Sequence, residues 1–90
     1  MGTAAVRMKI MPESPASDLK KIEKEVKTFI EKDGGRIMNF TQEPIAFGLK
    51  AIYASFEWPE EKELDDLEAK LNKVEEVKSA EVSDIRRAIG

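Results

Sequence analysis

The 90-residue sequence offers few side chains that could perform covalent or metal chemistry. It contains no cysteine and no histidine, so the usual soft ligands of zinc, iron–sulfur clusters and haem are missing, together with most pairings of a nucleophile and a base. Its 5 glycines are scattered and form no phosphate-cradling loop. We therefore expect no metal or covalent catalysis, no cofactor or metal, and a protein that is not itself a nucleotide-binding GTPase.

Carboxylates are the most numerous candidates for chemistry, and they concentrate in one stretch. A hydrolytic pair or a divalent cation site could be imagined among them. The simpler interpretation is a solvated helix face, because leucines repeat at helical spacing through the same stretch. The residues concerned are Glu60, Glu61, Glu63, Asp65, Asp66 and Glu68.

An aromatic residue lies between two small ones in a segment that ought to be a polar connection. The segment Glu43–Lys50 reads EPIAFGLK, with Phe47 between Ala46 and Gly48. An exposed ring at this position would be an anchor for a protein partner. The alternative is a ring that folds back over the end of the core, and the residues alone favour neither.

The same segment does not fit the base-stacking motif of RNA-recognition domains. If Phe47 takes the first aromatic position, Ile45 falls where that motif has a basic residue, and Leu49 and Ile52 fall on its other aromatic positions. The chain also has 15 Lys and Arg against 18 Asp and Glu, a formal net charge of -3. We therefore expect no direct nucleic-acid partner.

The sequence shows no targeting or membrane signal. No N-terminal stretch combines a basic flank with the apolar run of a signal peptide, and no apolar run approaches the roughly 20 residues that span a bilayer. We expect a cytoplasmic protein without a membrane partner. At the other end, Arg86 and Arg87 are adjacent, and by themselves they indicate only a basic tail.

Four strands and two helices must position these residues. Alternation of apolar and polar residues predicts strands over 4–11, 36–43, 49–58 and, more briefly, 80–85. In the second of these strands we expect one face to hold Met38 and Phe40 and the other to hold Ile37, Asn39 and Thr41.

Apolar residues at helical spacing predict the two helices. The first begins after Ser17 or Asp18, either of which can accept hydrogen bonds from free amides, and it stops at the glycine pair 34–35. The second begins at Pro59 and ends near Glu76, and its acidic start complements the helix dipole.

The order strand, helix, strand, strand, helix, strand predicts one α+β domain over residues 1–90. Two such crossovers fold into a ferredoxin-like βαββαβ sandwich, a four-stranded antiparallel sheet with two helices on one face. This fold hosts many unrelated functions, so it decides little by itself. We expect its buried side chains to include Ile10, Ile22, Val26, Phe29, Phe40, Ile52, Phe56, Leu67, Leu71 and Val82.

Three motifs resemble the archaeal elongation factor 1-beta family: Met11–Pro15 (MPESP), Glu43–Ala51 (EPIAFGLKA) and Ser83–Arg87 (SDIRR). The likeness extends over essentially the full chain. It implies a protein that is not an enzyme but a guanine-nucleotide exchange factor, which promotes release of GDP from elongation factor 1-alpha during translation elongation. Such a factor works by binding the nucleotide-free GTPase more tightly than the GDP-bound one.

The resemblance also implies site residues. Phe47, with Ala46, Gly48 and Lys50 beside it, is expected to dock on the GTPase. In the eukaryotic relatives a lysine near the C-terminus reaches the magnesium site, but its place here falls near Gly90. Arg86 and Arg87 are the nearest cations, so we expect one of them to replace that lysine.

Two alternatives from other functional classes remain open at this point. A metabolite-sensing regulatory domain would gain thermal stability with some small ligand by mass action. An RNA-binding domain, the less favoured of the two, would show salt-dependent affinity for oligonucleotides.

Overall fold

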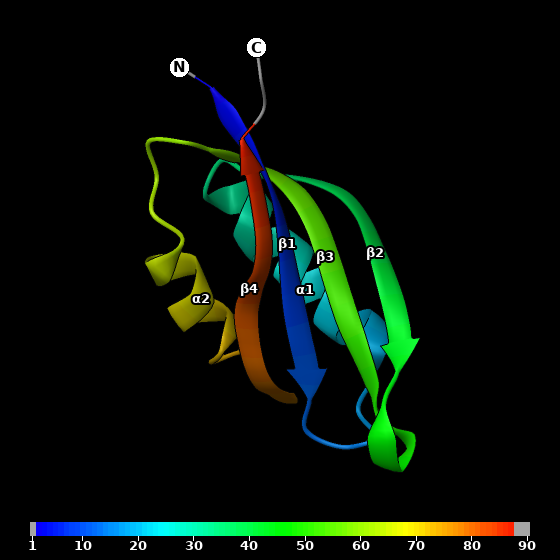
Figure 1. Ribbon diagram of the computed structural model, residues 1–90. Coiled ribbons are helices and arrows are strands. Elements are labelled where there is room, and N and C mark those ends of the chain that lie inside the picture. Colours follow the sequence, from blue (N-terminus) through cyan, green and yellow to red (C-terminus); the bar gives the residue numbers. More distant parts are fainter. Residues whose placement is uncertain (1, 88–90) are drawn as a thin grey trace.

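Four strands form one antiparallel sheet in the spatial order β2-β3-β1-β4, and two helices pack against it (Figure 1). This computed structural model describes residues 2–87. The arrangement confirms the predicted ferredoxin-like fold. In chain order the elements are β1 (Thr3–Pro12), α1 (Leu19–Lys32), β2 (Arg36–Pro44), the short 3-10 turn η1 (Ala46–Gly48), β3 (Lys50–Pro59), α2 (Asp65–Leu71) and β4 (Val77–Arg87).

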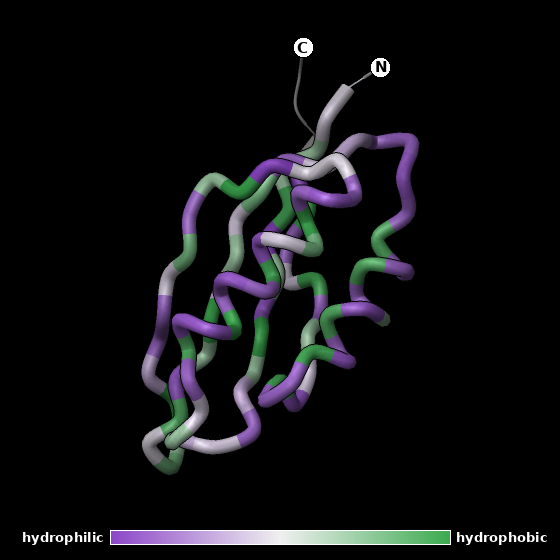
Figure 2. Tube along the Cα trace, turned by 180° about the vertical axis from the view of Figure 1, so that it is seen from behind, coloured by the Kyte–Doolittle hydropathy of each residue, from purple (hydrophilic) through white to green (hydrophobic). Residues whose placement is uncertain are grey.

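Both helices cover the same face of the sheet. In Figure 1 the sheet lies in front of the helices, and in Figure 2, seen from behind, the helices lie in front of the sheet. In β1 every second residue is buried under the helices, because successive side chains of a strand point to opposite faces. The same alternation in β3 buries Ile52, Ala54, Phe56 and Trp58. Each large apolar side chain removed from water in this way contributes about 1.5–3 kcal/mol.

The expected core is confirmed for the most part. Phe29, Phe40 and Val82 are only partly buried and pack against its edge. The fully buried members of the predicted set are Ile10, Ile22, Val26, Ile52, Phe56, Leu67 and Leu71.

Helix α1 begins and ends where its sequence predicts. The Asp18 side chain accepts a hydrogen bond from the backbone amide of Lys21 at 3.2 Å, which satisfies one of the free donors of the first turn. At the other end the chain turns directly against the core. A Cβ at Gly35 would lie only 2.7 Å from Ile30 Cγ2 and 2.8 Å from Trp58 Cε3, so only glycine fits there.

Helix α2 is shorter than predicted at both ends. Pro59 is the last residue of β3 and does not begin the helix, which starts at Asp65. The intervening loop is held by the Trp58 indole, whose Nε1 donates to the carbonyl of Lys62 at 3.1 Å. The helix then stops at Leu71, well before Glu76, which has a positive φ of 70° and leads into β4. Neither helix in the described residues is long and apolar enough to cross a membrane.

Strand β2 contains a bulge that reverses part of the predicted alternation. Ile37 is paired with Phe56, but Asn39 is already paired with Ser55, so Met38 is an extra residue. As a result Ile37 packs against the core on the helix side, and Met38 is 61% exposed. The expectation that Met38 and Phe40 share one face was wrong for this reason.

Helix α2 also protects the outer edge of β4. Asn72 accepts a hydrogen bond from the Ala80 amide and donates one to the Ala80 carbonyl, both at 3.0 Å. Glu68 accepts a hydrogen bond from the Val82 amide at 2.9 Å. These side chains take the place of a neighbouring strand, and the backbone groups that they bind are no longer open to pairing with another chain.

Candidate functional site

The β2–β3 hairpin ends in a tight turn that presents Phe47 to solvent. Ile45 and Leu49 close the turn, with the Ile45 amide donating to the Leu49 carbonyl at 2.8 Å, and both side chains are half-buried. Ala46, Phe47 and Gly48 are exposed between them, and Phe47 is 93% exposed. The ring therefore does not fold back over the core.

The backbone of this turn is strained at the aromatic residue. Phe47 has φ 62° and ψ 28°, and Gly48 has φ 77°. These left-handed conformations are the ones that both central residues of a type I′ hairpin turn require, and Asn-Gly is the usual choice for them. Glycine adopts such a conformation freely, whereas a phenylalanine pays about 1–2 kcal/mol for it. An exposed ring in a strained position is not explained by stability.

A second loop lies close to the hairpin tip. A Cβ built on Gly48 would lie 3.9 Å from Pro15, so the tip is close to the β1–α1 connection. That connection is stiffened by Ser14, whose hydroxyl accepts a hydrogen bond from the Ala16 amide at 3.2 Å, and whose own amide donates to the Ser17 hydroxyl at 3.2 Å. The MPESP motif, here called the base, thus lies beside the Phe47 turn.

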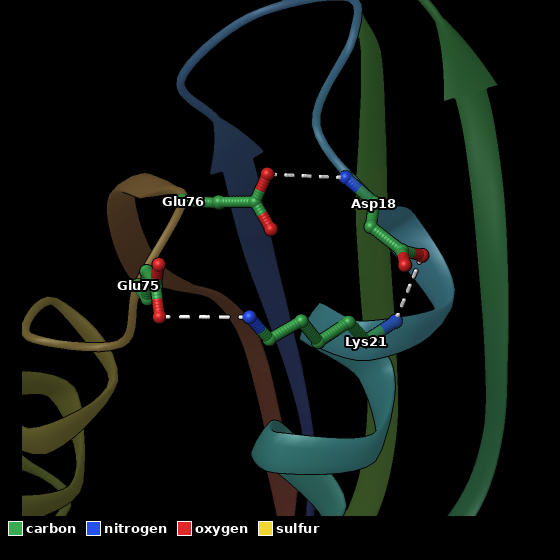
Figure 3. A network of polar contacts seen from close by, with 4 residues as sticks. All are labelled: Asp18, Lys21, Glu75 and Glu76. Atoms are coloured by element: carbon green, nitrogen blue, oxygen red, sulfur yellow. Dashed lines mark hydrogen bonds and ion pairs between the residues drawn. The ribbon is translucent and has the colours of Figure 1, made fainter.

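Four polar residues tie this base to the loop between α2 and β4 (Figure 3). The Glu76 carboxylate accepts from the Asp18 amide at 3.4 Å, and Lys21 reaches Glu75 at 3.5 Å. The Glu13 amide also donates to the Glu76 carbonyl at 2.9 Å. The two side-chain contacts are exposed and individually weak, but together with the backbone bond they join two loops at the end of the molecule that carries the hairpin tip.

The arginine end of the chain lies far from the Phe47 turn. Arg86 pairs with Ala5 near the start of β1, at the end of the sheet opposite the hairpin tip (Figure 1). About ten residues of extended strand, or roughly 30 Å, separate Phe47 from the level of Arg86 along the sheet. The longest dimension of the molecule is 42 Å. The sequence-predicted site residues thus form two groups: Ala46, Phe47, Gly48 and Lys50 at one end, and Arg86 and Arg87 at the other.

Arg86 is exposed and partly held by its neighbour. Its Nε lies 3.2 Å from Asp84 Oδ2, and its side chain is 83% exposed. Strand β4 extends to Arg87, whose backbone pairs with Ala4. The side chain of Arg87 lies outside the part of the chain that the structure describes. Lys50 is exposed at the start of β3, opposite Pro44.

The acidic stretch, all of which lies within the described residues, forms no metal-binding cluster. Most of its members are exposed, and among the described residues no cluster of carboxylates is arranged to hold a metal ion. Glu68 is the exception to a purely solvated face, because its carboxylate binds the backbone of β4. Its role is structural.

Sequence reasoning missed the face of the sheet that no helix covers. Arg7 lies on this face, with its guanidinium carbon 4.3 Å from the centre of the Tyr53 ring. Alternation in residues 4–11 places Arg7 and Lys9 on the polar side of the strand. That pattern could have identified the face, but not the arginine–tyrosine stacking, which depends on the register between β1 and β3.

Comparison with known proteins gives a consistent result. Residues 5–88 match the EF-1 guanine nucleotide exchange domain family. The chain is 36% identical over 87 residues to elongation factor 1-beta of Methanococcus maripaludis, an alignment that covers 94% of this chain and 97% of the relative. It is 38% identical over 88 residues to elongation factor 1-beta of Methanocaldococcus jannaschii, with 92% and 98% covered. A third relative of the same name, from Methanoculleus marisnigri, is 39% identical over 83 residues.

Proposed function

The chain belongs to the EF-1 guanine nucleotide exchange domain family, and we propose that it promotes release of GDP from the GTPase elongation factor 1-alpha. Family membership supports a nucleotide-exchange role in translation elongation. We propose further that the GTPase is elongation factor 1-alpha, that GDP is exchanged for GTP, and that the chain acts in the cytoplasm. In this proposal the chain performs no covalent chemistry itself.

The observation that carries the proposal is the Phe47 turn. A ring that is 93% exposed in a left-handed backbone conformation lowers the stability of the free protein. The cost is recovered if the ring enters an apolar pocket of the GTPase, since buried aromatic anchors supply much of the energy of protein interfaces. Ala46 and Gly48 leave room around the ring, and Lys50 adds a positive charge nearby.

The distance between the two groups of site residues suggests how binding could expel GDP. A GTPase that contacts both ends must extend over roughly 30 Å of this molecule. Phe47 then holds the GTPase at one point, while Arg86 or Arg87 acts at a second point. Binding energy gained at the first point can be used to stabilise a nucleotide-free geometry at the second.

We propose that an arginine of the tail acts on the magnesium and phosphate contacts of GDP. A cation placed near a bound magnesium ion repels the metal and competes for the same carboxylate and phosphate oxygens. Arg86 is exposed, and only its Nε contacts Asp84, so its other donors are available. Arg87 is the second candidate, nearer the end of the chain.

The direct test is release of a fluorescent GDP analogue from elongation factor 1-alpha of the same organism. Adding the chain in the presence of excess unlabelled nucleotide should accelerate release well above the spontaneous rate, and more so at higher concentrations of the chain. A heat-unfolded sample of the chain is the control. Release at the spontaneous rate with the folded chain would contradict the proposed function.

A further inference from the structure

The helix-free face of the sheet contains a hollow of about 380 Å³ between the two edge strands. Four strands contribute to it, so it is a feature of the sheet itself and not of a single loop. Its polar lining consists of Arg7, Asn39, Ser55, Asp84 and Arg86. The hollow lies at the arginine end of the molecule and shares Arg86 with the proposed exchange site.

Two bulges place these residues side by side. The extra residue of β2, Met38, precedes Asn39, and an extra residue in β4, Ser83, precedes Asp84. Asn39 and Arg7 are both opposite Ser55, and Arg7 is opposite Asp84, so both bulges occur at the same level of the sheet. Bulges bend a strand and redirect its side chains, and they concentrate near functional sites.

The bulge in β4 also determines which side of the sheet receives Arg86. Arg7 is paired with Asp84 and Ala5 with Arg86, which puts Asp84 and Arg86 on the helix-free face. Without the extra residue after Val82, the alternation of the strand would turn both side chains toward the helices. The hollow therefore depends on this irregularity.

Arg7 is held in place without being neutralised. Its guanidinium lies over the Tyr53 ring at 4.3 Å, an arrangement that fixes the orientation of the planar group. Among the residues described, no carboxylate lies within 4.0 Å of it, and Asp84 is instead bound to Arg86. Arg7 thus presents a fork of donors that matches the two oxygens of a carboxylate.

We propose that this hollow receives a carboxylate side chain of the GTPase, with Arg7 as its principal contact; this inference rests on the proposed exchange function. Two arginines and one aspartate give the lining a net charge of +1, which one carboxylate balances. Asn39 and Ser55 supply neutral hydrogen-bonding groups beside it. A phosphate monoester carries nearly two negative charges, which the lining does not balance. The carboxylate contact would fix the orientation of the GTPase next to Arg86.

The test measures binding of the nucleotide-free GTPase to variants of Arg7 and Tyr53 by calorimetry. Arg7→Gln should weaken binding about tenfold or more, because the partner carboxylate loses a charged bidentate donor. Arg7→Lys keeps the charge but loses the fork and the stacking, so it should weaken binding several-fold. Tyr53→Leu should have a similar effect to Arg7→Lys, whereas Tyr53→Phe, which keeps the ring, should bind as the wild type does.

Two further variants separate the hollow from general electrostatics. Lys27 is exposed on α1, on the other side of the sheet, and Lys27→Gln makes the same change in net charge as Arg7→Gln. It should change the Kd by less than twofold. Asp84→Asn removes the repelling carboxylate from the hollow, so it should tighten binding a few-fold.

Several results would overturn the inference while leaving the proposed function intact, provided that the wild-type chain accelerates GDP release. These are wild-type affinity of Arg7→Gln, equal losses in Arg7→Gln and Lys27→Gln, or weaker binding of Asp84→Asn. Competition by single-stranded RNA that depends on Arg7 would also overturn it, in favour of a nucleic-acid ligand. If the wild-type chain fails to accelerate release, the proposed function fails first.

Discussion

Alternate residues of β1 belong to two faces of the sheet, one buried under the helices and one exposed. Val6, Met8 and Ile10 are at most 2% exposed and pack under the helices, whereas Arg7 lies on the helix-free face against Tyr53. Burial explains the first surface completely. It explains neither the stacked arginine nor the exposed, strained Phe47. The comparison indicates that the helix-covered face maintains the fold, and it is the reason why we propose the hairpin tip and the helix-free face as binding surfaces for a partner.

The largest expected effect comes from removing a side chain of the helix-covered face. Phe56 is fully buried in β3, so Phe56→Ala should lower the free energy of unfolding by about 3–5 kcal/mol. Ser55→Ala, one residue away on the opposite face, should change it by less than about 0.5 kcal/mol. Urea denaturation followed by circular dichroism measures both. Equal losses would mean that the two faces do not differ as described.

The protected edge of β4 gives a smaller effect. Asn72→Ala removes both side-chain bonds to Ala80 and leaves a partly buried amide without a partner, so stability should fall by about 1–2 kcal/mol. In the same variant, hydrogen exchange of the Ala80 amide should be faster than in the wild type. Lys73→Ala, at the exposed neighbouring position, serves as the control. An unchanged exchange rate of the Ala80 amide in the Asn72→Ala variant would mean that Asn72 does not protect this edge.

The hairpin tip should respond in the opposite direction. Asparagine tolerates the left-handed conformation better than phenylalanine, so Phe47→Asn should raise the free energy of unfolding by roughly 1 kcal/mol. Phe47→Ala also lacks the ring but keeps an unfavourable left-handed residue, and its stability should stay near that of the wild type. If both variants lose stability, Phe47 contributes to packing and the contrast between the two regions disappears.

The arginine end should affect exchange and not stability. Arg86→Ala breaks only an exposed ion pair, so its melting temperature should be unchanged. The maximal rate of GDP release at saturating factor should fall for Arg86→Ala, for Arg87→Ala, or for both. A full maximal rate in both variants would mean that the tail displaces no magnesium, and that the sheet and the Phe47 loop alone remodel the GTPase.

Much of this fold follows from sequence because its strands and helices are strongly periodic. Asp18 and the glycine pair 34–35 mark the ends of α1, and alternation identifies the buried residues of β1 and β3. The end of α2 at Leu71 was missed because Asn72 binds Ala80, a contact that depends on the position of β4. Local pattern contains no information about such tertiary partners.

The site was only partly predictable for a similar reason. Phe47 stands out in the sequence, yet its exposure and left-handed backbone come from a type I′ turn, which a Phe-Gly pair does not predict. The hollow depends on bulges at Met38 and Ser83, which reverse the alternation that sequence analysis relies on. Irregular positions of this kind are set by pairing across the sheet.

One titration tests the central claim most directly: the rate of GDP release from elongation factor 1-alpha against the concentration of wild-type chain and of Phe47→Ala. Loss of an interface anchor should cost about 2 kcal/mol or more, so the variant should need roughly thirtyfold more protein to reach half of the maximal rate. Phe47→Tyr, which keeps the ring, should stay close to the wild type. Superimposable curves for wild type and Phe47→Ala would contradict the claim that the exposed ring exists to bind the GTPase.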